Sequence, residues 1–257
     1  MSKRAFGLVD LILHPLVIRR WRRTASAADQ VSLGMLRRIR LRALELRQAL
    51  DRIIFVANGR LALPLIGSNT FPKPLHSDWS WRPQLWRGPI FPPGRAAVES
   101  KSDFGDEVTI FHDCRISELT VRQMRNTREE DLAPYGLRLD VFKFDGSFLS
   151  LVIELPDSAM RGLTRKHLLR LNAVIETEKK LEIFARVNIQ HGPNTEQMVR
   201  ELPLDDKEFS IDFDLAYTKL NEKRVERAWV DLIFEGPEMN QVMLRDVNFS
   251  RRPRAEV

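Results

Sequence analysis

Residues 181–189 read LEIFARVNI, and apolar and polar side chains largely alternate along them. Residues 209–215, FSIDFDL, repeat the pattern. A period of two places every second side chain on the same face of an extended chain, so each segment predicts a strand with one buried face and one polar face. The same alternation, less regular, is found in other segments: 137–144, 147–155, 167–176, 228–235 and 241–250.

Turn residues separate these strands. The turns are predicted at Asp145-Gly146, Gly192-Pro193-Asn194 and Gly236-Pro237. Short, regularly spaced strands with such turns are typical of an antiparallel β-sandwich, and we expect the jelly-roll-like form. In the last segment the alternation slips between Leu244 and Val247, which predicts a β-bulge. The fold class is therefore mainly β, preceded by basic α-helices.

The segment 32–57 has a different period. Apolar residues recur there in two series of sevens: Leu36, Ala43, Leu50, Ala57 and Ile39, Leu46, Ile53. This a/d pattern over about three heptads predicts one long helix with an apolar stripe. Three heptads are marginal for an independent coiled coil, so two interpretations stay open. The stripe packs on the chain's own domain, or it meets a partner helix.

Positive charge is concentrated in the N-terminal part. Residues 1–60 carry 13 Lys and Arg against four acids, a net charge of +9, whereas the rest carries 28 against 31, a net charge of −3. We also expect an amphipathic helix over residues 5–23, bent or broken at Pro15. The predicted anion- or partner-binding residues lie on these two helices: Arg19, Arg20, Trp21, Arg22, Arg23, Arg37 and Arg38.

Three parts of the chain follow from these patterns. Residues 1–57 form a basic helical segment, residues 58–105 a segment rich in Pro and Trp, and residues 106–257 the sandwich. Closely spaced prolines exclude long helices from the middle part. Its tryptophans are predicted to anchor it on an apolar surface: Trp79, Trp81 and Trp86.

The N-terminus does not have the pattern of a secretory signal. Asp10, His14 and Pro15 interrupt its apolar stretch, which is also too short to span a bilayer. Cys114 is the only cysteine, so an intrachain disulfide is excluded. We therefore expect a cytoplasmic protein, with peripheral attachment to a membrane as an option.

Recognised catalytic motifs are missing from the sequence. The five histidines have no metal-binding spacing, and no phosphate loop or nucleophile elbow occurs. We predict no catalytic residue, no metal and no cofactor, and hence a protein that is not an enzyme. An enzyme of sugar metabolism would need two facing carboxylates from different strands, such as Asp140 and Glu154.

A ligand-binding site is predicted at two places. Trp229, Asp231 and Glu235 share one face of a strand, where an aromatic ring and carboxylates can hold a sugar. A predicted loop over residues 188–196 is rich in hydrogen-bonding side chains: Asn188, His191, Asn194 and Glu196. Such polar loops also offer oxygen ligands for calcium.

Four stretches of the chain resemble an uncharacterised bacterial family described as a domain of unknown function. They are residues 60–71, 78–83, 191–196 and 249–256. The similarity covers nearly the whole chain and implies no activity. The closing strand, residues 242–252, is similar to the last strand of galactose-binding-type jelly-rolls.

The leading hypothesis is a non-catalytic, lectin-like sandwich that binds a glycan, with basic helices that contact an anionic membrane surface or a protein partner. The first alternative is an assembly subunit that docks through the helix at 32–57. The second alternative is the sugar enzyme. Nucleic acid is disfavoured because base-stacking aromatics are scarce among the arginines and the sandwich is net acidic.

Overall fold

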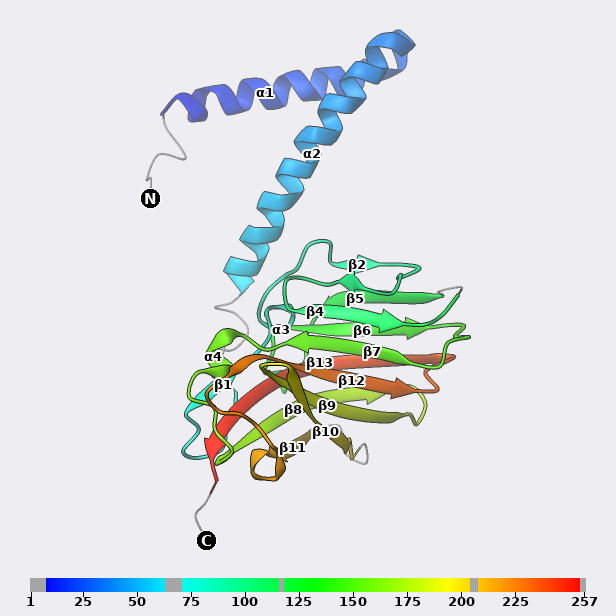
Figure 1. The fold of residues 1–257 in the computed structure, drawn as a ribbon. Helices are drawn as coiled ribbons and strands as arrows, with labels where there is room; N and C mark the ends of the chain where they lie inside the picture. Colours follow the sequence, from blue (N-terminus) through cyan, green and yellow to red (C-terminus); the bar gives the residue numbers. More distant parts are fainter. Residues whose placement is uncertain (1–7, 63–70, 116–117, 204–207, 255–257) are drawn as a thin grey trace. The chain divides into compact units, whose positions relative to one another are not determined.

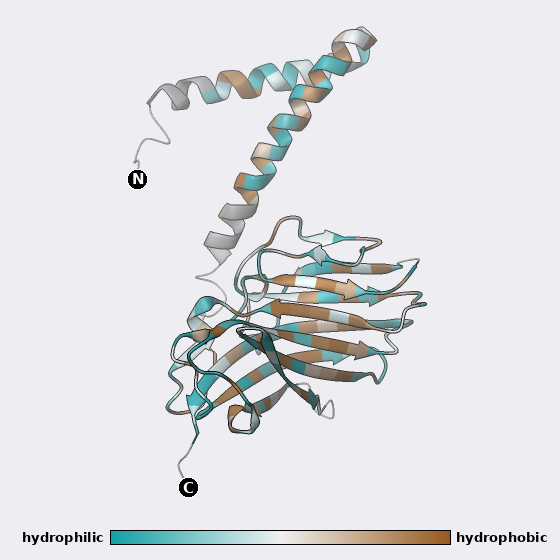
Figure 2. Ribbon diagram, viewed as in Figure 1, coloured by the Kyte–Doolittle hydropathy of each residue, from teal (hydrophilic) through white to brown (hydrophobic). Residues whose placement is uncertain are grey.

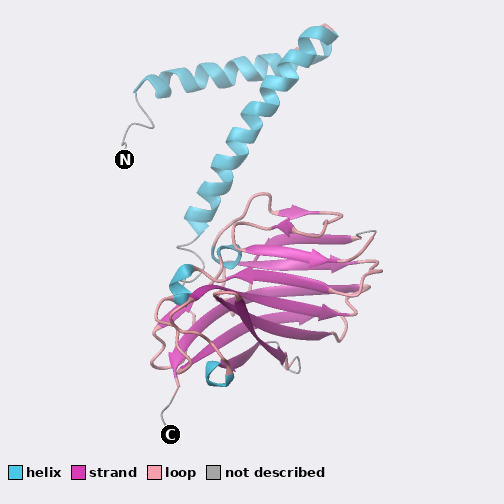
Figure 3. Cartoon of the chain, viewed as in Figure 1, coloured by secondary structure: helices cyan, strands magenta, loops and turns pink. Residues whose placement is uncertain are grey.

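A computed structural model of the protein describes residues 8–62, 71–115, 118–203 and 208–254. The chain divides into two compact units, residues 1–54 and 55–257. Helices make up the first unit and strands dominate the second (Figures 1 and 3).

The first unit contains helix α1 (Leu8–Ser26), the short turn η1 (Ala28–Gln30) and most of helix α2 (Leu33–Ala62). Of the bend or break expected at Pro15, the break is wrong, because α1 continues through this residue. Proline removes one backbone donor, but its fixed φ lies in the helical range. The start expected at residue 5 lies outside the described residues. Helix α2 continues past residue 57, to Ala62.

The side chains of these helices are largely exposed. All six predicted anion-binding arginines are exposed, whereas Trp21 is half-buried. Along the predicted stripe of α2, Leu36, Ile39 and Ala43 are half-buried, while Leu46 and Leu50 are exposed. Figure 2 shows apolar and polar residues interleaved along this helix. Neither described helix has an apolar stretch long enough to cross a membrane.

The second unit consists of two antiparallel sheets. Sheet A contains β1 (Trp79–Trp81), β2 (Gly94–Arg95), β5 (Leu119–Arg125), β6 (Tyr135–Val141), β8 (His167–Thr177), β11 (Glu208–Asp214) and β13 (Asn240–Pro253). Sheet B contains β3 (Ser102–Asp103), β4 (Val108–His112), β7 (Leu149–Glu154), β9 (Glu182–His191), β10 (Asn194–Glu201) and β12 (Val225–Glu235). Short helical turns lie between strands: α3 (Gln84–Arg87), α4 (Asp157–Met160) and η2 (Leu215–Tyr217).

The strand order is β11–β8–β13–β6–β5–β2 in sheet A, with β1 paired to β13, and β10–β9–β12–β7–β4–β3 in sheet B. The fold is therefore a mainly β, jelly-roll-like sandwich preceded by basic helices, as predicted. Its core lies between the sheets. In β9 the core-facing residues include Ile183, Ala185 and Val187, and in β11 they include Phe209 and Phe213, which confirms the period of two.

The predicted loop over residues 188–196 is wrong. Asn188 and His191 lie in β9, Asn194 and Glu196 lie in β10, and the two strands pair across a tight turn. Gly192 makes this turn with a φ of +60°, a conformation that glycine adopts without steric cost. The bulge expected in the last strand is confirmed, because the register of β13 against β8 shifts between Leu244 and Asp246.

Residues 71–105 of the Pro- and Trp-rich segment pack on the sandwich, whereas residues 58–62 belong to helix α2. Trp86 is fully buried, and its indole Nε1 donates to the carbonyl oxygen of Leu244 at 3.0 Å. Trp81 stacks on Phe249 with 5.9 Å between ring centroids. Trp79 also packs against the core. The anchoring role predicted for these tryptophans is confirmed.

Candidate ligand-binding groove

The outer face of sheet B carries a groove of about 650 Å³, which we call the sheet B groove. It crosses β4, β7, β9, β10 and β12. Its lining side chains are Thr109, Phe111, Phe148, Ser150, Val152, Glu154, Arg186, Asn188, Gln197, Arg227, Trp229, Asp231 and Ile233. In β12 the lining residues alternate with Val230 and Leu232, which are buried in the core, so strand geometry alone brings one set to the groove.

Strand register arranges the polar lining in rows across the sheet. Trp229 pairs with Glu154 of β7 on one side and with Asn188 of β9 on the other, and Asn188 pairs with Gln197 of β10. With strands about 4.8 Å apart, this row is about 14 Å long. In the next row Asp231 pairs with Arg186. These two rows therefore combine side chains from β7, from the β9–β10 hairpin and from β12.

A buried carboxylate forms the floor. The Asp231 side chain is 3% exposed, whereas that of Arg186, its partner, is 38% exposed. Asp231 Oδ2 accepts hydrogen bonds from Arg186 Nε at 2.7 Å and from Asn188 Nδ2 at 3.0 Å. Asn188 Oδ1 in turn accepts from Gln197 Nε2 at 2.9 Å. A buried charge is tolerated when it is paired and hydrogen-bonded in this way.

The one tryptophan of the groove lies beside a second ion pair. The guanidinium of Arg227 is 4.9 Å from the centroid of the Trp229 ring. The same guanidinium binds Glu154 through two hydrogen bonds, with 2.9 Å from Nε to Oε2. A cation over an aromatic face is attracted by its quadrupole. Arg227 thus covers part of one face of the Trp229 ring.

The other end of the groove is apolar. Phe111 and Phe148 line it together with Val152 and Ile233. Phe148 is 41% exposed. A pocket with polar groups at one end and apolar rings at the other suits a ligand that has both kinds of surface.

The predicted site residues separate into two sets. Asn188, Trp229 and Asp231 line the groove, as the shared strand face suggested. Glu235 lies on the same face of β12 as Trp229 and Asp231, but it is exposed at the end of the strand. It is about 13 Å along the strand from Asp231 and is not among the residues that line the groove.

His191, Asn194 and Glu196 do not join the groove, which corrects their grouping with Asn188. His191 and Asn188 are three residues apart on one strand, so they lie on opposite faces. Asn194 pairs with His191, and Glu196 pairs with core-facing Ile189. Glu196 Oε1 lies 3.6 Å from His191 Nε2. The hairpin interpretation replaces the predicted polar loop.

Sequence reasoning missed several groove residues: Glu154, Arg186, Gln197 and Arg227. Arg186 is two residues from Asn188 and shares its face, so parity within one strand was a signal for it. Arg227 is two residues from Trp229 on β12, so the same signal was available for it. Glu154 and Gln197 depend on which strands are neighbours and in what register, and the chain's local pattern does not contain this information.

The carboxylate pair considered for an enzyme does not form. Asp140 lies in sheet A and accepts from Arg138 Nε at 2.8 Å, whereas Glu154 lies in sheet B and contacts Arg227. Each residue alternates with core residues on its strand, Leu139 and Ile153 respectively. The two carboxylates therefore point away from each other on opposite sides of the sandwich.

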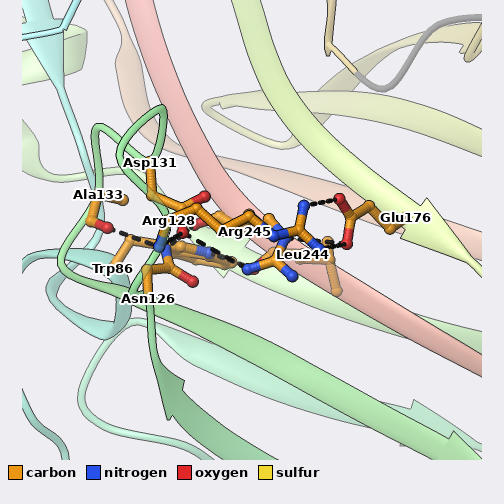
Figure 4. A network of polar contacts seen from close by, with 8 residues as sticks. All are labelled: Trp86, Asn126, Arg128, Asp131, Ala133, Glu176, Leu244 and Arg245. Carbon is orange, nitrogen blue, oxygen red and sulfur yellow. Dashed lines mark hydrogen bonds and ion pairs between the residues drawn. The ribbon is translucent and has the colours of Figure 1, made fainter.

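The outer face of sheet A has its own pocket, of about 450 Å³. Figure 4 shows the charged network at its edge. Arg128 and Arg245 both donate to Glu176, and Arg245 lies 3.5 Å from Asp131. Burial raises the pKa of Glu176, but the two arginines outweigh it and lower that pKa overall. Asn126 Nδ2 closes the loop by donating to the carbonyl oxygens of Ala133 and Arg245, each at 2.8 Å.

A second ion pair below this pocket is almost completely buried. Arg82 and Asp246 make two hydrogen bonds of 2.8 and 2.7 Å, and their side chains are 1% and 8% exposed. Asn248 Nδ2 also donates to Asp246, at 3.1 Å. Burial raises the pKa of Asp246 in spite of these donors. Arg82 Nη1 is buried without a partner among the described residues.

Metal ligands do not gather in the described residues. Within residues 8–62, 71–115, 118–203 and 208–254, no three His, Cys, Asp or Glu side chains come close enough to hold an ion. This includes residues 188–196, whose polar side chains were considered as calcium ligands.

A family model described as a family of unknown function (DUF6478) matches residues 1–257. This confirms the resemblance seen in four stretches of the sequence. No curated protein matches the chain.

Solved structures with a similar fold were also found. The enzymatically active domain of tailspike protein 4 from bacteriophage CBA120 is 7% identical, with a TM-score of 0.41, over 56% of this chain and 19% of the other. The family 11 carbohydrate-binding module from Clostridium thermocellum is 12% identical, with a TM-score of 0.39, over 62% and 96%. A xylan-binding CBM22-1 domain from Paenibacillus barcinonensis is 9% identical, with a TM-score of 0.35, over 63% and 94%. The chain thus spans about a fifth of the tailspike chain.

Proposed function

The chain belongs to this family of unknown function, and we propose from its groove that it is a non-catalytic glycan-binding protein. The observation that carries the proposal is the pairing of Trp229 with the hydrogen-bonded floor of Asp231 and Asn188 in one groove. A sugar ring has an apolar face and a polar rim of hydroxyls. The aromatic surface fits the first and the floor fits the second.

The floor has hydrogen-bonding capacity left for hydroxyls. Asp231 Oδ2 accepts two hydrogen bonds, while no described residue donates to Asp231 Oδ1. Gln197 uses one amide hydrogen on Asn188 and is otherwise exposed. Gln197 lies in the row of Trp229 and Asp231 lies in the next row, so a ring stacked on the indole would have hydroxyls within their reach.

The surroundings of the groove carboxylates support binding rather than hydrolysis. Asp231 and Glu154 lie diagonally across two paired strands, a spacing of about 7–8 Å between Cβ atoms. Hydrolysis of a glycoside by such a pair needs both carboxyl groups directed at the sugar. Each of these carboxylates instead forms an ion pair with an arginine of the groove.

Binding is tested with the full chain on a printed glycan array, followed by calorimetry with the glycans that bind. We expect Trp229→Ala to lose at least about tenfold in affinity, since it removes the aromatic surface. Tyr217→Ala is the matched control, because Tyr217 is an exposed aromatic outside the groove. If no glycan binds the unaltered chain, or if Trp229→Ala binds as well as Tyr217→Ala, the proposal fails. Release of reducing sugar would contradict its non-catalytic part.

We further propose that the basic helices contact an anionic membrane surface. The supporting observation is that Arg19, Arg20, Arg22 and Arg23 are all exposed on one stretch of α1. Each basic residue near an anionic surface contributes about 1 kcal/mol. The full chain should float with vesicles of phosphatidylglycerol and not with phosphatidylcholine. Replacement of the four arginines by Gln should abolish flotation, and flotation that persists would exclude this contact.

A further inference from the structure

We propose that the glycan held in the sheet B groove carries an anionic group, a carboxylate or a sulfate, and that Arg186 binds it. This inference rests on the proposed function and adds the chemical class of the ligand. In the groove the arginine side chains are more exposed than the carboxylates they bind, although the numbers of the two are equal.

The formal charges of the groove cancel, but their accessible parts do not. Arg186 is 38% exposed above an Asp231 side chain that is 3% exposed, and Arg227 is 56% exposed beside a Glu154 that is 30% exposed. In both pairs the guanidinium faces solvent and the carboxylate lies deeper. An incoming ligand therefore meets the two cations first, and its distance to each carboxylate is greater than to each guanidinium.

Arg186 has more free hydrogen-bond donors than Arg227. Its Nε is fixed by Asp231 at 2.7 Å, and no described residue accepts a hydrogen bond from its Nη1 or Nη2. Arg227 by contrast directs both Nε and Nη2 at Glu154. Because Nε is held, the Nη1 and Nη2 groups lie side by side in a fixed position and form a two-pronged donor, or fork. This is the geometry that binds two oxygens of a carboxylate or sulfate.

The position of this fork agrees with the rest of the groove. Arg186 pairs with Asp231, which is two residues along β12 from Trp229. A sugar stacked on Trp229 would then place a ring substituent over the next row, where the Nη groups of Arg186 lie. One ligand can use the ring and the fork together.

The test is affinity electrophoresis of the full chain in gels that contain matched polymers. Pectate is compared with fully methyl-esterified pectin for a carboxylate, and carrageenan with desulfated carrageenan for a sulfate. We expect retention by one of the charged polymers to exceed that by its neutral partner by at least about tenfold. The arginines of α1 and α2 also attract polyanions, so the evidence is the difference between variants that share these helices.

Two variants of the groove should change retention by the charged polymer in opposite directions. Arg186→Lys keeps the charge but loses the fork, so retention by the charged polymer should fall about tenfold. Asp231→Asn keeps an acceptor for Arg186 Nε and removes a negative charge, so retention should rise severalfold. Arg170→Lys is the control, because Arg170 binds Asp212 on the outer face of sheet A. Thermal unfolding of each variant verifies that it is folded.

The outcomes separate the two proposals. Equal retention of Arg186→Lys and Arg170→Lys, or a fall in Asp231→Asn, overturns the anionic ligand. If neutral polymers are retained as strongly as charged ones and Trp229→Ala abolishes this, the ligand is a neutral glycan and only the further inference fails. If Trp229→Ala changes nothing on any polymer, both proposals fail.

Discussion

The two outer faces of the sandwich both carry arginine–carboxylate pairs, but they use them differently. On sheet A the Arg82–Asp246 pair is buried on both sides, and Arg245 joins Asp131 and Glu176 in a closed network. On sheet B each carboxylate lies deeper than its arginine. The Arg82–Asp246 pair of sheet A therefore has almost no exposed donor, whereas the two pairs of the sheet B groove leave donors at the surface.

This comparison shows why counting charged residues does not identify a site. Asp246 and Asp231 are both buried aspartates on outer faces, and their sequence surroundings give no distinction. The difference lies in the exposure of the arginine that each one binds. We therefore expect the buried pair of sheet A to contribute more to the free energy of unfolding than the groove pairs of sheet B.

The largest effect is expected from breaking the buried pair of sheet A. Arg82→Met leaves Asp246 charged and without its main partner, so the free energy of unfolding should fall by about 3–5 kcal/mol. Urea denaturation measures it. The double variant Arg82→Met/Asp246→Leu removes both charges and should recover a large part of the loss. A loss below about 1 kcal/mol in the single variant would show that the pair does not hold the segment in place.

A smaller effect is expected for the pH dependence of stability. The hydrogen bonds from Arg170 lower the pKa of Asp212 against the effect of burial. Because the folded pKa is below the unfolded one, this contribution is complete above the unfolded pKa of about 3.9 and is lost as the pH falls through the folded value. Asp212→Asn should therefore be less stable at pH 7, by up to about 1 kcal/mol, and lose less on acidification. Thermal unfolding from neutral to acid pH measures the stability difference at pH 7 and the loss on acidification. If the stability of the variant and that of the unaltered chain fall in parallel, Asp212 does not contribute to the pH dependence.

The smallest effect is expected on sheet B. Arg227→Ala removes an exposed ion pair and one cation–π contact, so unfolding should change by no more than about 1 kcal/mol. The Trp229 ring loses its cover, so quenching by acrylamide should increase. A loss comparable to that of Arg82→Met would remove the distinction between the two faces.

Much of the fold could be predicted because burial imposes a period on the sequence. β9 and β11 were found from alternation, and the bulge of β13 from its interruption. β10 was missed because it is an edge strand, NTEQMVRE, whose residues are largely exposed on both faces, so no alternation is required of it. At Pro15 a bend or a break was expected, and the break was wrong because the fixed φ of proline lies in the helical range and the helix continues on both sides.

From the sequence, only site residues that lie on the same strand could be grouped together. Trp229 and Asp231 were found because residues two apart share a face. Asn188 was found for the wrong reason, as part of a loop, and its neighbours His191 and Glu196 face the other side of the sheet. The partners Glu154 and Gln197 come from strands whose register is set by the whole sandwich.

The bulge in β13 sets the reading frame of the last strand. Before it Leu244 faces the core, and after it Val247 and Phe249 do, while Arg245 and Asp246 both face outward. If the same residues continued as a regular strand without the bulge, Val247 and Phe249 would turn to solvent and Asp246 would turn to the core. The extra residue therefore keeps the apolar side chains of the last part of β13 on the core side, and a relative that lacks this residue would keep the same faces only if it also lacks the bulge.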